Sequence, residues 1–237
     1  RKAVIEIKTP AEIESMRKAS RVVAEVLKEL TPLVKPGVTT AELDKFAERR
    51  VRELGAVPAF LGYRGYPATL CVSINEEIVH GIPSAKRTVR AGDIVSLDMG
   101  AVIEGFYGDA AVTVAAGAIS PQARRLMEVT SRSLDEALSA VRAGVRLGDV
   151  CHAVEKYAEA NGMSVVREFT GHGIGRHLHE EPSIPNFGRP GSGPVLKAGM
   201  TLAIEPMLCL GGADVVVKND GWTAVSADGS LAADDGR

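Results

Sequence analysis

The sequence predicts an α+β protein in which two similar halves, related by a pseudo-twofold axis, surround a central antiparallel sheet. Helix-start signals precede four segments of helical periodicity, short apolar runs are separated by glycine-containing turns as strands are, and two phrases recur at one constant offset. We therefore expect residues 1–237 to form one domain that contains an internal repeat of roughly residues 9–117 and 118–237.

The four predicted helices begin at recognisable sequence signals. Thr9-Pro10-Ala11-Glu12 is a capping box with proline at the first helical position, and Thr39-Thr40-Ala41-Glu42 is a second capping box. Gly55 ends the second helix, and the later pair begins at Ser120-Pro121 and near Leu147. The predicted helices therefore cover residues 10–30, 40–55, 121–143 and 147–161.

An offset of 107 residues relates the two halves. Arg90-Ala91-Gly92, before the run IVSLD, corresponds to Lys197-Ala198-Gly199, before TLAIE, and an earlier pair of glycine turns shows the same offset. The offset also carries Asp98 onto Glu205. A duplicated unit of helices followed by strands predicts a symmetric pair of half-sites, in which these two carboxylates are counterparts.

Asp98 and Asp109 lie in two strand-like runs joined by a short polar turn. If the turn is centred between Ile103 and Glu104, the two aspartates lie directly opposite each other, and a register that differs by two residues makes them diagonal neighbours. Like charges so close are destabilising unless a cation lies between them. Two solvated aspartates are the alternative, but apolar neighbours such as Leu97 and Phe106 indicate a covered sheet and favour a shared divalent cation.

His172 and Glu205 are the other candidate metal ligands. Glycines flank His172 in the phrase TGHGIG and allow close approach of backbone or ligand, which a packed core histidine rarely needs. Glu205 is bracketed by apolar residues, and a buried glutamate needs a partner. An oxygen-rich set with one imidazole suits Mn, Fe, Co or Zn, and bridging carboxylates favour two ions that hold one water or hydroxide.

Two further histidines head similar phrases, His80-Gly81-Ile82-Pro83-Ser84 and His179-Glu180-Glu181-Pro182-Ser183. As counterparts in the two halves they are expected to flank the metal cleft and to serve in proton transfer or transition-state hydrogen bonding. Either histidine alone is more often a loop or capping residue, so the prediction depends on the pair.

The composition narrows the classes of partner. The chain is 45% hydrophobic and 24% charged, with a net charge of −2 and a pI near 6.3, so no broad basic face for nucleic acid or anionic membrane is expected. No apolar run reaches the length of a membrane-spanning helix, and the first residues lack a secretory signal. Three cysteines without paired spacing indicate reduced thiols and a cytoplasmic protein.

Several phrases together resemble the type I methionine aminopeptidase family over nearly the whole chain. The phrases are Leu61–Pro67, Ser73–Glu77 running into His80–Pro83, Gly108-Asp109, Thr170–Gly175, His179–Pro182 and Ile204–Met207. The resemblance implies the pita-bread (creatinase/aminopeptidase) fold. It implies hydrolysis of the first peptide bond of nascent chains that begin with methionine and a small second residue, by a hydroxide that bridges two divalent ions.

The resemblance also assigns residues. It implies that the metal ligands are Asp98, Asp109, His172 and Glu205. His80 and His179 would contact the substrate amide and the tetrahedral intermediate, and Glu205 would also act as general base. The methionine pocket would be formed by Phe60, Tyr63, Tyr66, Cys71, Leu178 and Trp222, although loop packing is an alternative for the two tyrosines. The partner is the nascent N-terminus; a monomer is expected, and a transient ribosome contact stays open.

The C-terminal stretch departs from the family pattern. In the family, the phrase that resembles Asp228–Ala233 leads into a strand with a second glutamate that bridges both metals, whereas here Asp234-Asp235-Gly236-Arg237 follows. Either that ligand is absent or about ten residues are missing between Ala233 and Asp234. We favour missing residues, because a sheet without this strand would expose an unpaired edge beside the site.

Two other functions compete with this interpretation. A proline-specific aminopeptidase of the same fold would share the ligands, but it usually carries an additional N-terminal domain, and the phrases around Tyr63 and His80 favour the methionine enzyme. A non-catalytic binding module that lost its metal is consistent with the missing glutamate, but the four remaining ligands argue against it.

Overall fold

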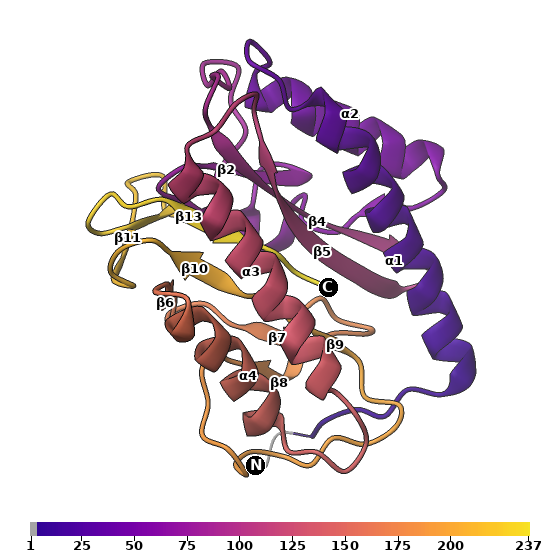
Figure 1. Cartoon of the computed structure of the whole chain (residues 1–237). Helices are drawn as coiled ribbons and strands as arrows, with labels where there is room; N and C mark the ends of the chain where they lie inside the picture. The colour runs from indigo at the N-terminus through magenta and orange to yellow at the C-terminus, as the bar shows by residue number, and fades with distance from the viewer. Residues whose placement is uncertain (1–3) are drawn as a thin grey trace.

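Capping boxes begin the first two helices of the computed structural model, which describes residues 4–237 (Figure 1). Helix α1 spans Pro10–Leu30 and α2 spans Thr40–Glu53. In α1 the Thr9 side chain accepts from the Glu12 N–H, and the Glu12 carboxylate accepts from the Thr9 N–H; Thr39 and Glu42 make the same pair of bonds in α2. Both predicted helix starts are confirmed.

The second helix pair follows the same plan with weaker caps. Helix α3 spans Pro121–Ala140, and α4 spans Leu147–Ala160 without a side-chain cap. The predicted end of α3 at residue 143 was three residues too late, because Val141 already has an extended ψ of 115°. Two short 3₁₀ turns, η1 (Thr31–Leu33) and η2 (Tyr63–Gly65), complete the helical elements described. No helix in residues 4–237 is long and apolar enough to cross a bilayer.

Antiparallel strands form four small sheets. The largest has the order β1-β4-β2, with β5 also paired to β4; the others are β13-β10-β6, β11-β12-β3 and β8-β7-β9. The strands are β1 (Val57–Pro58), β2 (Leu70–Ile74), β3 (Glu77–Val79), β4 (Ile94–Ile103), β5 (Phe106–Ala115), β6 (Ser164–Val165), β7 (Gly171–Gly173), β8 (Glu180–Ile184), β9 (Leu202–Ala203), β10 (Met207–Cys209), β11 (Val215–Val217), β12 (Ala224–Ser226) and β13 (Ala232–Asp234).

The β4–β5 hairpin corrects the predicted register. Glu104 and Gly105 form its two-residue turn and both have positive φ, 54° and 79°. Turns of this kind match the twist of the flanking strands, so the hairpin is centred between these two residues, one position later than expected. Asp98 therefore pairs with Ala111, and Asp109 pairs with Gly100. The directly opposed arrangement was wrong, and the two aspartates are diagonal neighbours.

Corresponding backbone features recur at the 107-residue offset. Gly92 and Gly199 have φ values of 94° and 91°, so both turns require the left-handed region that glycine tolerates best. The isolated bridge between Thr39 and Thr88 has its counterpart between Arg146 and Val195. The bounds of the two halves themselves remain a prediction.

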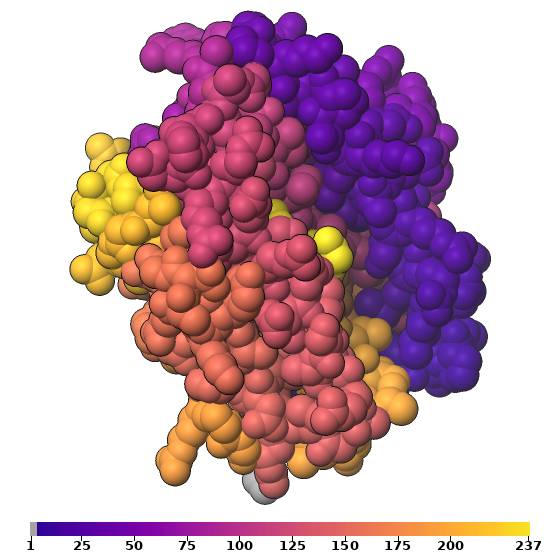
Figure 2. Space-filling model, viewed as in Figure 1, coloured from indigo at the N-terminus to yellow at the C-terminus, as the bar shows by residue number. Residues whose placement is uncertain are grey.

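Each helix pair covers its own part of the sheet structure. Apolar residues of α1 and α2 pack with those of β2 and β4, and those of α3 and α4 pack with β6, β10 and β13. In Figure 1 the strands lie between the two helix pairs, and in Figure 2 α3 and α4 cover the face toward the viewer.

The C-terminal residues join the two regions. Strand β13 pairs with β10 from Ala232 to Asp234, and Gly236 then forms a bridge with Ala111 of β5. If no residues were missing between Ala233 and Asp234, an exposed sheet edge was expected. Residues 232–236 cover that edge.

Candidate metal centre

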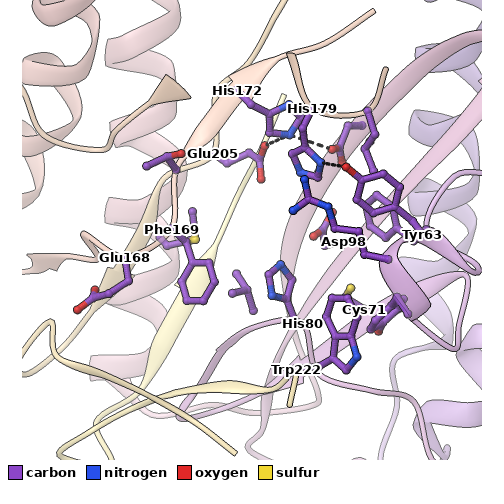
Figure 3. A pocket seen from close by; sticks show the side chains of 18 residues that line it. Tyr63, Cys71, His80, Asp98, Glu168, Phe169, His172, His179, Glu205 and Trp222 are labelled. Atoms are coloured by element: carbon purple, nitrogen blue, oxygen red, sulfur yellow. Dashed lines mark hydrogen bonds and ion pairs between the residues drawn. The ribbon is translucent and has the colours of Figure 1, made fainter. Parts of the chain in front are cut away.

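Three side chains from different segments of the chain meet at one point. Nε2 of His172, on β7, lies 3.5 Å from Oδ2 of Asp109, on β5, and 3.1 Å from Oε1 of Glu205, in the segment between β9 and β10. One ligand atom from each of the three residues lies within 4.8 Å of the other two. Figure 3 shows the side chains of His172 and Glu205 next to each other. This geometry can hold a metal ion with oxygen and imidazole ligands.

Glycines on both sides of His172 allow its strand to pack closely. A Cβ at Gly171 would lie 2.3 Å from the carbonyl oxygen of Ala203, and a Cβ at Gly173 would lie 2.1 Å from that of Glu181. The close approach predicted from the TGHGIG phrase is therefore real, and backbone segments make it. Nδ1 of His172 lies 2.8 Å from the Gly173 carbonyl oxygen, so the N–H donated there leaves Nε2 free to face the carboxylates.

Apart from His172, no positively charged side chain of residues 4–237 forms an ion pair with Asp98, Asp109 or Glu205. Within residues 4–237, Oδ1 of Asp98 and Oε1 of Glu205 are shut off from solvent without a hydrogen-bond partner, and neither residue forms an ion pair with lysine or arginine. Burial, and after it the negative charge of Asp109, raises the pKa of Asp98 well above its usual range. Unpaired buried carboxylates are costly, and a divalent cation would compensate them. The donor set thus fits a divalent metal ion.

The imidazole of His172 responds to the same negative charge. Burial lowers its pKa, but the contacts with Asp109 and Glu205 outweigh that effect and raise the pKa to about 10. The raised pKa thus reports the strong negative charge that surrounds the imidazole.

A cavity of about 330 Å³ adjoins this cluster. The structure places all the residues predicted to bind substrate around it: Phe60, Tyr63, Tyr66, Cys71, His80, Leu178, His179 and Trp222. Asp98, Asp109, His172 and Glu205 also line it, so every predicted site residue faces one space.

His80 and His179 approach the cavity from different segments, on either side of Asp98 in the view of Figure 3. The His179 ring lies 4.3 Å from that of His172, and its Nδ1 lies 2.7 Å from the Tyr63 hydroxyl. Burial, followed by the positive charge on His172, lowers the pKa of His179 to about 4, and burial also lowers the pKa of His80. Both imidazoles are therefore neutral near pH 7.

The apolar end of the cavity is held by fixed aromatic side chains. The buried Tyr66 hydroxyl lies within hydrogen-bond distance of two carbonyl oxygens, 3.0 Å from that of Leu70 and 3.2 Å from that of Gly81. Its ring meets the Trp222 edge at a centroid distance of 5.1 Å. Tyr66 therefore both packs within its loop and lines the cavity, so its two predicted roles are compatible.

Sequence reasoning missed six residues that line the cavity: Arg64, Val79, Glu168, Phe169, Thr170 and Met207. Arg64, Thr170 and Met207 lie inside recognised phrases, and Val79 and Phe169 are direct neighbours of such phrases. Their position in or beside these phrases was the signal that could have identified them.

No glutamate follows Glu205 in the sequence. Gly236 occupies the position beside Glu205 on the neighbouring segment, where an added Cβ would lie 2.9 Å from Glu205 Cγ. A second glutamate at this position is therefore absent.

Comparisons with known proteins agree in the family they indicate. Residues 14–228 match metallopeptidase family M24. The methionine aminopeptidase of Clostridium acetobutylicum is 49% identical over 230 residues, which cover 97% of this chain and 92% of that protein. Methionine aminopeptidase 1 of Bacillus subtilis is 48% identical over 226 residues, covering 95% and 91% of the two chains.

Solved structures show the same relationship. A methionine aminopeptidase from Thermotoga maritima superposes with a TM-score of 0.97 at 48% identity, covering 98% of this chain and 94% of that one. An Xaa-Pro dipeptidase from Bacillus anthracis shares the fold alone, with a TM-score of 0.74 at 22% identity, covering 97% of this chain and 58% of that one.

Proposed function

The chain belongs to metallopeptidase family M24, and we propose that it is a metal-dependent aminopeptidase that removes N-terminal methionine from polypeptides. The expected α+β pita-bread fold is confirmed by its structural neighbours. The observation that carries the proposal is the cavity itself: an apolar, aromatic end adjoins a cluster of buried carboxylates and one imidazole. The names of the relatives at 44–49% identity point the same way.

The buried cluster and the family both indicate divalent metal binding. The proposal is more specific: two ions, chosen among Co, Mn, Fe and Zn, are held by Asp98, Asp109, His172 and Glu205. Bound divalent ions supply Lewis-acid polarisation of a carbonyl and a lowered pKa of water. Glu205 has its pKa raised by burial, so that its carboxylate can accept a proton from the attacking water.

Neutral histidines can act as hydrogen-bond donors to the reacting peptide. When the Tyr63 hydroxyl donates to Nδ1 of His179, the proton of that ring is on Nε2, where it can stabilise the developing oxyanion. His80 has a left-handed backbone with φ of 61°, and its ring packs edge-on against Phe169 at 5.2 Å. We assign His80 to the substrate amide, because its ring is held at the cavity wall by this contact.

The apolar end of the cavity suits an unbranched thioether side chain. Phe60, Cys71, Leu178 and Trp222 provide apolar and aromatic walls, and the two hydroxyl contacts of Tyr66 hold its ring in place. A cavity of about 330 Å³ is large enough to hold a methionine side chain.

We expect a monomer that acts in the cytoplasm on nascent chains, with at most a transient contact with the ribosome.

Peptide hydrolysis with controlled metal content tests the proposal. After removal of metal by a chelator, addition of Mn²⁺ or Co²⁺ should restore cleavage of Met-Ala-Ser but produce little cleavage of Ala-Pro peptides. Preferred cleavage of Ala-Pro peptides would instead identify a proline-specific aminopeptidase. A chain that binds neither ion and stays inactive after their addition would be a binding module, and the proposal would be wrong.

A further inference from the structure

We propose that Asp234 is a metal-binding carboxylate of this centre and takes the place of the second glutamate that the family resemblance implies. The inference rests on the proposed function, because it concerns the same metal site. It follows from the register of the C-terminal strand, the surroundings of the Asp234 side chain and the charge of the cluster.

The register places Asp234 on the face that carries the metal cluster. Two backbone hydrogen bonds between Ile204 and Arg237, of 2.8 and 3.0 Å, align the strands so that Glu205 lies opposite Gly236. Met207 lies opposite Asp234. Opposed residues in antiparallel strands point to the same side, and both Glu205 and Met207 line the cavity. Asp234 therefore points to the side of the sheet on which Glu205 lies.

Gly236 has no side chain that could bind a metal ion, and a side chain there would have to displace that of Glu205. An added Cβ would lie 2.9 Å from Glu205 Cγ and 3.4 Å from the backbone nitrogen of Ala111. Side chains on one face of a strand are two residues apart, so the neighbour on this face is Asp234. It is the last carboxylate of the chain on the face that carries the cluster.

The Asp234 side chain is buried and unpaired. The residue is 1% exposed, and Oδ1 has no hydrogen-bond partner among residues 4–237. The backbone is held in place by Thr113, whose Oγ1 donates to the Asp234 carbonyl oxygen at 2.8 Å and accepts from its N–H at 2.9 Å. A buried carboxylate that has no partner, on a backbone held in place, is costly unless a cation compensates its charge.

The charge of the cluster agrees with this role. Paired segments carry the four carboxylates Asp98, Asp109, Glu205 and Asp234, which together bear four negative charges when ionised. Asp234 thus restores the charge that a second glutamate would have supplied.

Asp235 provides a matched control on the same strand. It points to the opposite face, toward α3, and its Oδ1 accepts from the Thr113 N–H at 2.9 Å. Asp235→Asn therefore removes an adjacent buried carboxylate charge from the face that does not carry the cluster.

Metal titration compares the wild type, Asp234→Asn and Asp235→Asn. Each chain is stripped of metal, checked for folding by circular dichroism and titrated with Mn²⁺ by calorimetry, and bound metal is then counted by elemental analysis. We expect Asp234→Asn to weaken at least one Mn²⁺ site by 10-fold or more, and Asp235→Asn to stay within 2-fold of the wild type. Unchanged Mn²⁺ affinity and stoichiometry in folded Asp234→Asn would overturn the inference. A wild type that binds no metal would instead refute the proposed function.

A crystallographic measurement keeps the inference testable if the variant does not fold. An anomalous difference map of the wild type with Co²⁺ should show an ion within about 2.5 Å of an Asp234 oxygen, near the usual length of a carboxylate–metal bond. An ion bound by the other carboxylates with Asp234 out of reach would refute the role assigned to it.

Discussion

Tyr63→Phe tests whether the hydroxyl of Tyr63 positions His179 for catalysis. The substitution keeps the aromatic ring and removes the oxygen that lies 2.7 Å from His179 Nδ1. A net hydrogen bond of this kind contributes about 0.5–1.5 kcal/mol. Since about 1.4 kcal/mol corresponds to a tenfold change in rate, kcat should fall roughly 2- to 12-fold. The KM for Met-Ala-Ser should change little, because the bond orients a donor to the transition state and does not form the methionine pocket.

Steady-state kinetics of Mn²⁺-loaded protein provide the measurement, and a double-mutant cycle provides the control. In a His179→Ala background the Tyr63→Phe change should have no further effect on kcat, because its partner is gone. Tyr157→Phe removes a phenol hydroxyl from α4, away from the cavity, and should leave kcat unchanged. An unchanged kcat in Tyr63→Phe, or an equal loss in both backgrounds, would refute the positioning role.

Three further predictions concern packing, specificity and pH. Gly173→Ala places a Cβ 2.1 Å from the Glu181 carbonyl oxygen, so urea unfolding should show a loss of about 1–3 kcal/mol in unfolding free energy, and Mn²⁺ binding should weaken. Gly212→Ala is the control, because its Cβ meets nothing closer than 3.5 Å and its unfolding free energy should be nearly unchanged. Trp222→Ala removes a cavity wall, so the preference for methionine over leucine peptides, measured as the ratio of their kcat/KM values in competition assays, should fall by the equivalent of about 1–3 kcal/mol. An unchanged ratio would exclude Trp222 from the pocket. The Ser230 and Gly212 N–H groups lower the pKa of Asp228 from 3.8 to about 2, so its stabilising effect is complete above pH 3.8 and is lost as the pH falls through 2. Asp228→Asn should therefore reduce stability at pH 5, and the difference from the wild type should shrink at pH 2.5; a constant difference in urea midpoint would contradict the assignment.

Local signals in the sequence were enough for the helix starts and for the motif glycines. The bonds of the Thr9 and Thr39 capping boxes join residues three apart, so they depend little on the rest of the chain. The glycines beside His172 signalled a close approach before its partners were known. The helix end at Ala140 was harder to place, because the chain leaves the helix before the glycine turn that was expected to end it.

Strand register and contacts between residues far apart in the chain could not be predicted from the sequence pattern. The hairpin register depended on Glu104, a non-glycine residue that adopts a left-handed backbone, and this shifted the pairing of Asp98. Tyr63 and His179 are 116 residues apart, and no spacing rule joins them. The sequence did not single out Asp234 as a site residue, because its burial arises from the pairing of a three-residue strand with β10.

The sequence by itself determined the chemistry available to this protein: the carboxylates, the histidines and the glycines that allow close approach. It did so because capping, turn and motif signals act between residues near each other in the chain. Only the tertiary structure decided that Asp98 and Asp109 are diagonal, that Gly236 faces Glu205, and that Asp234 is buried on the face that carries the cluster. Strand register and burial are collective results of packing, in which a shift of one residue moves every side chain to the other face.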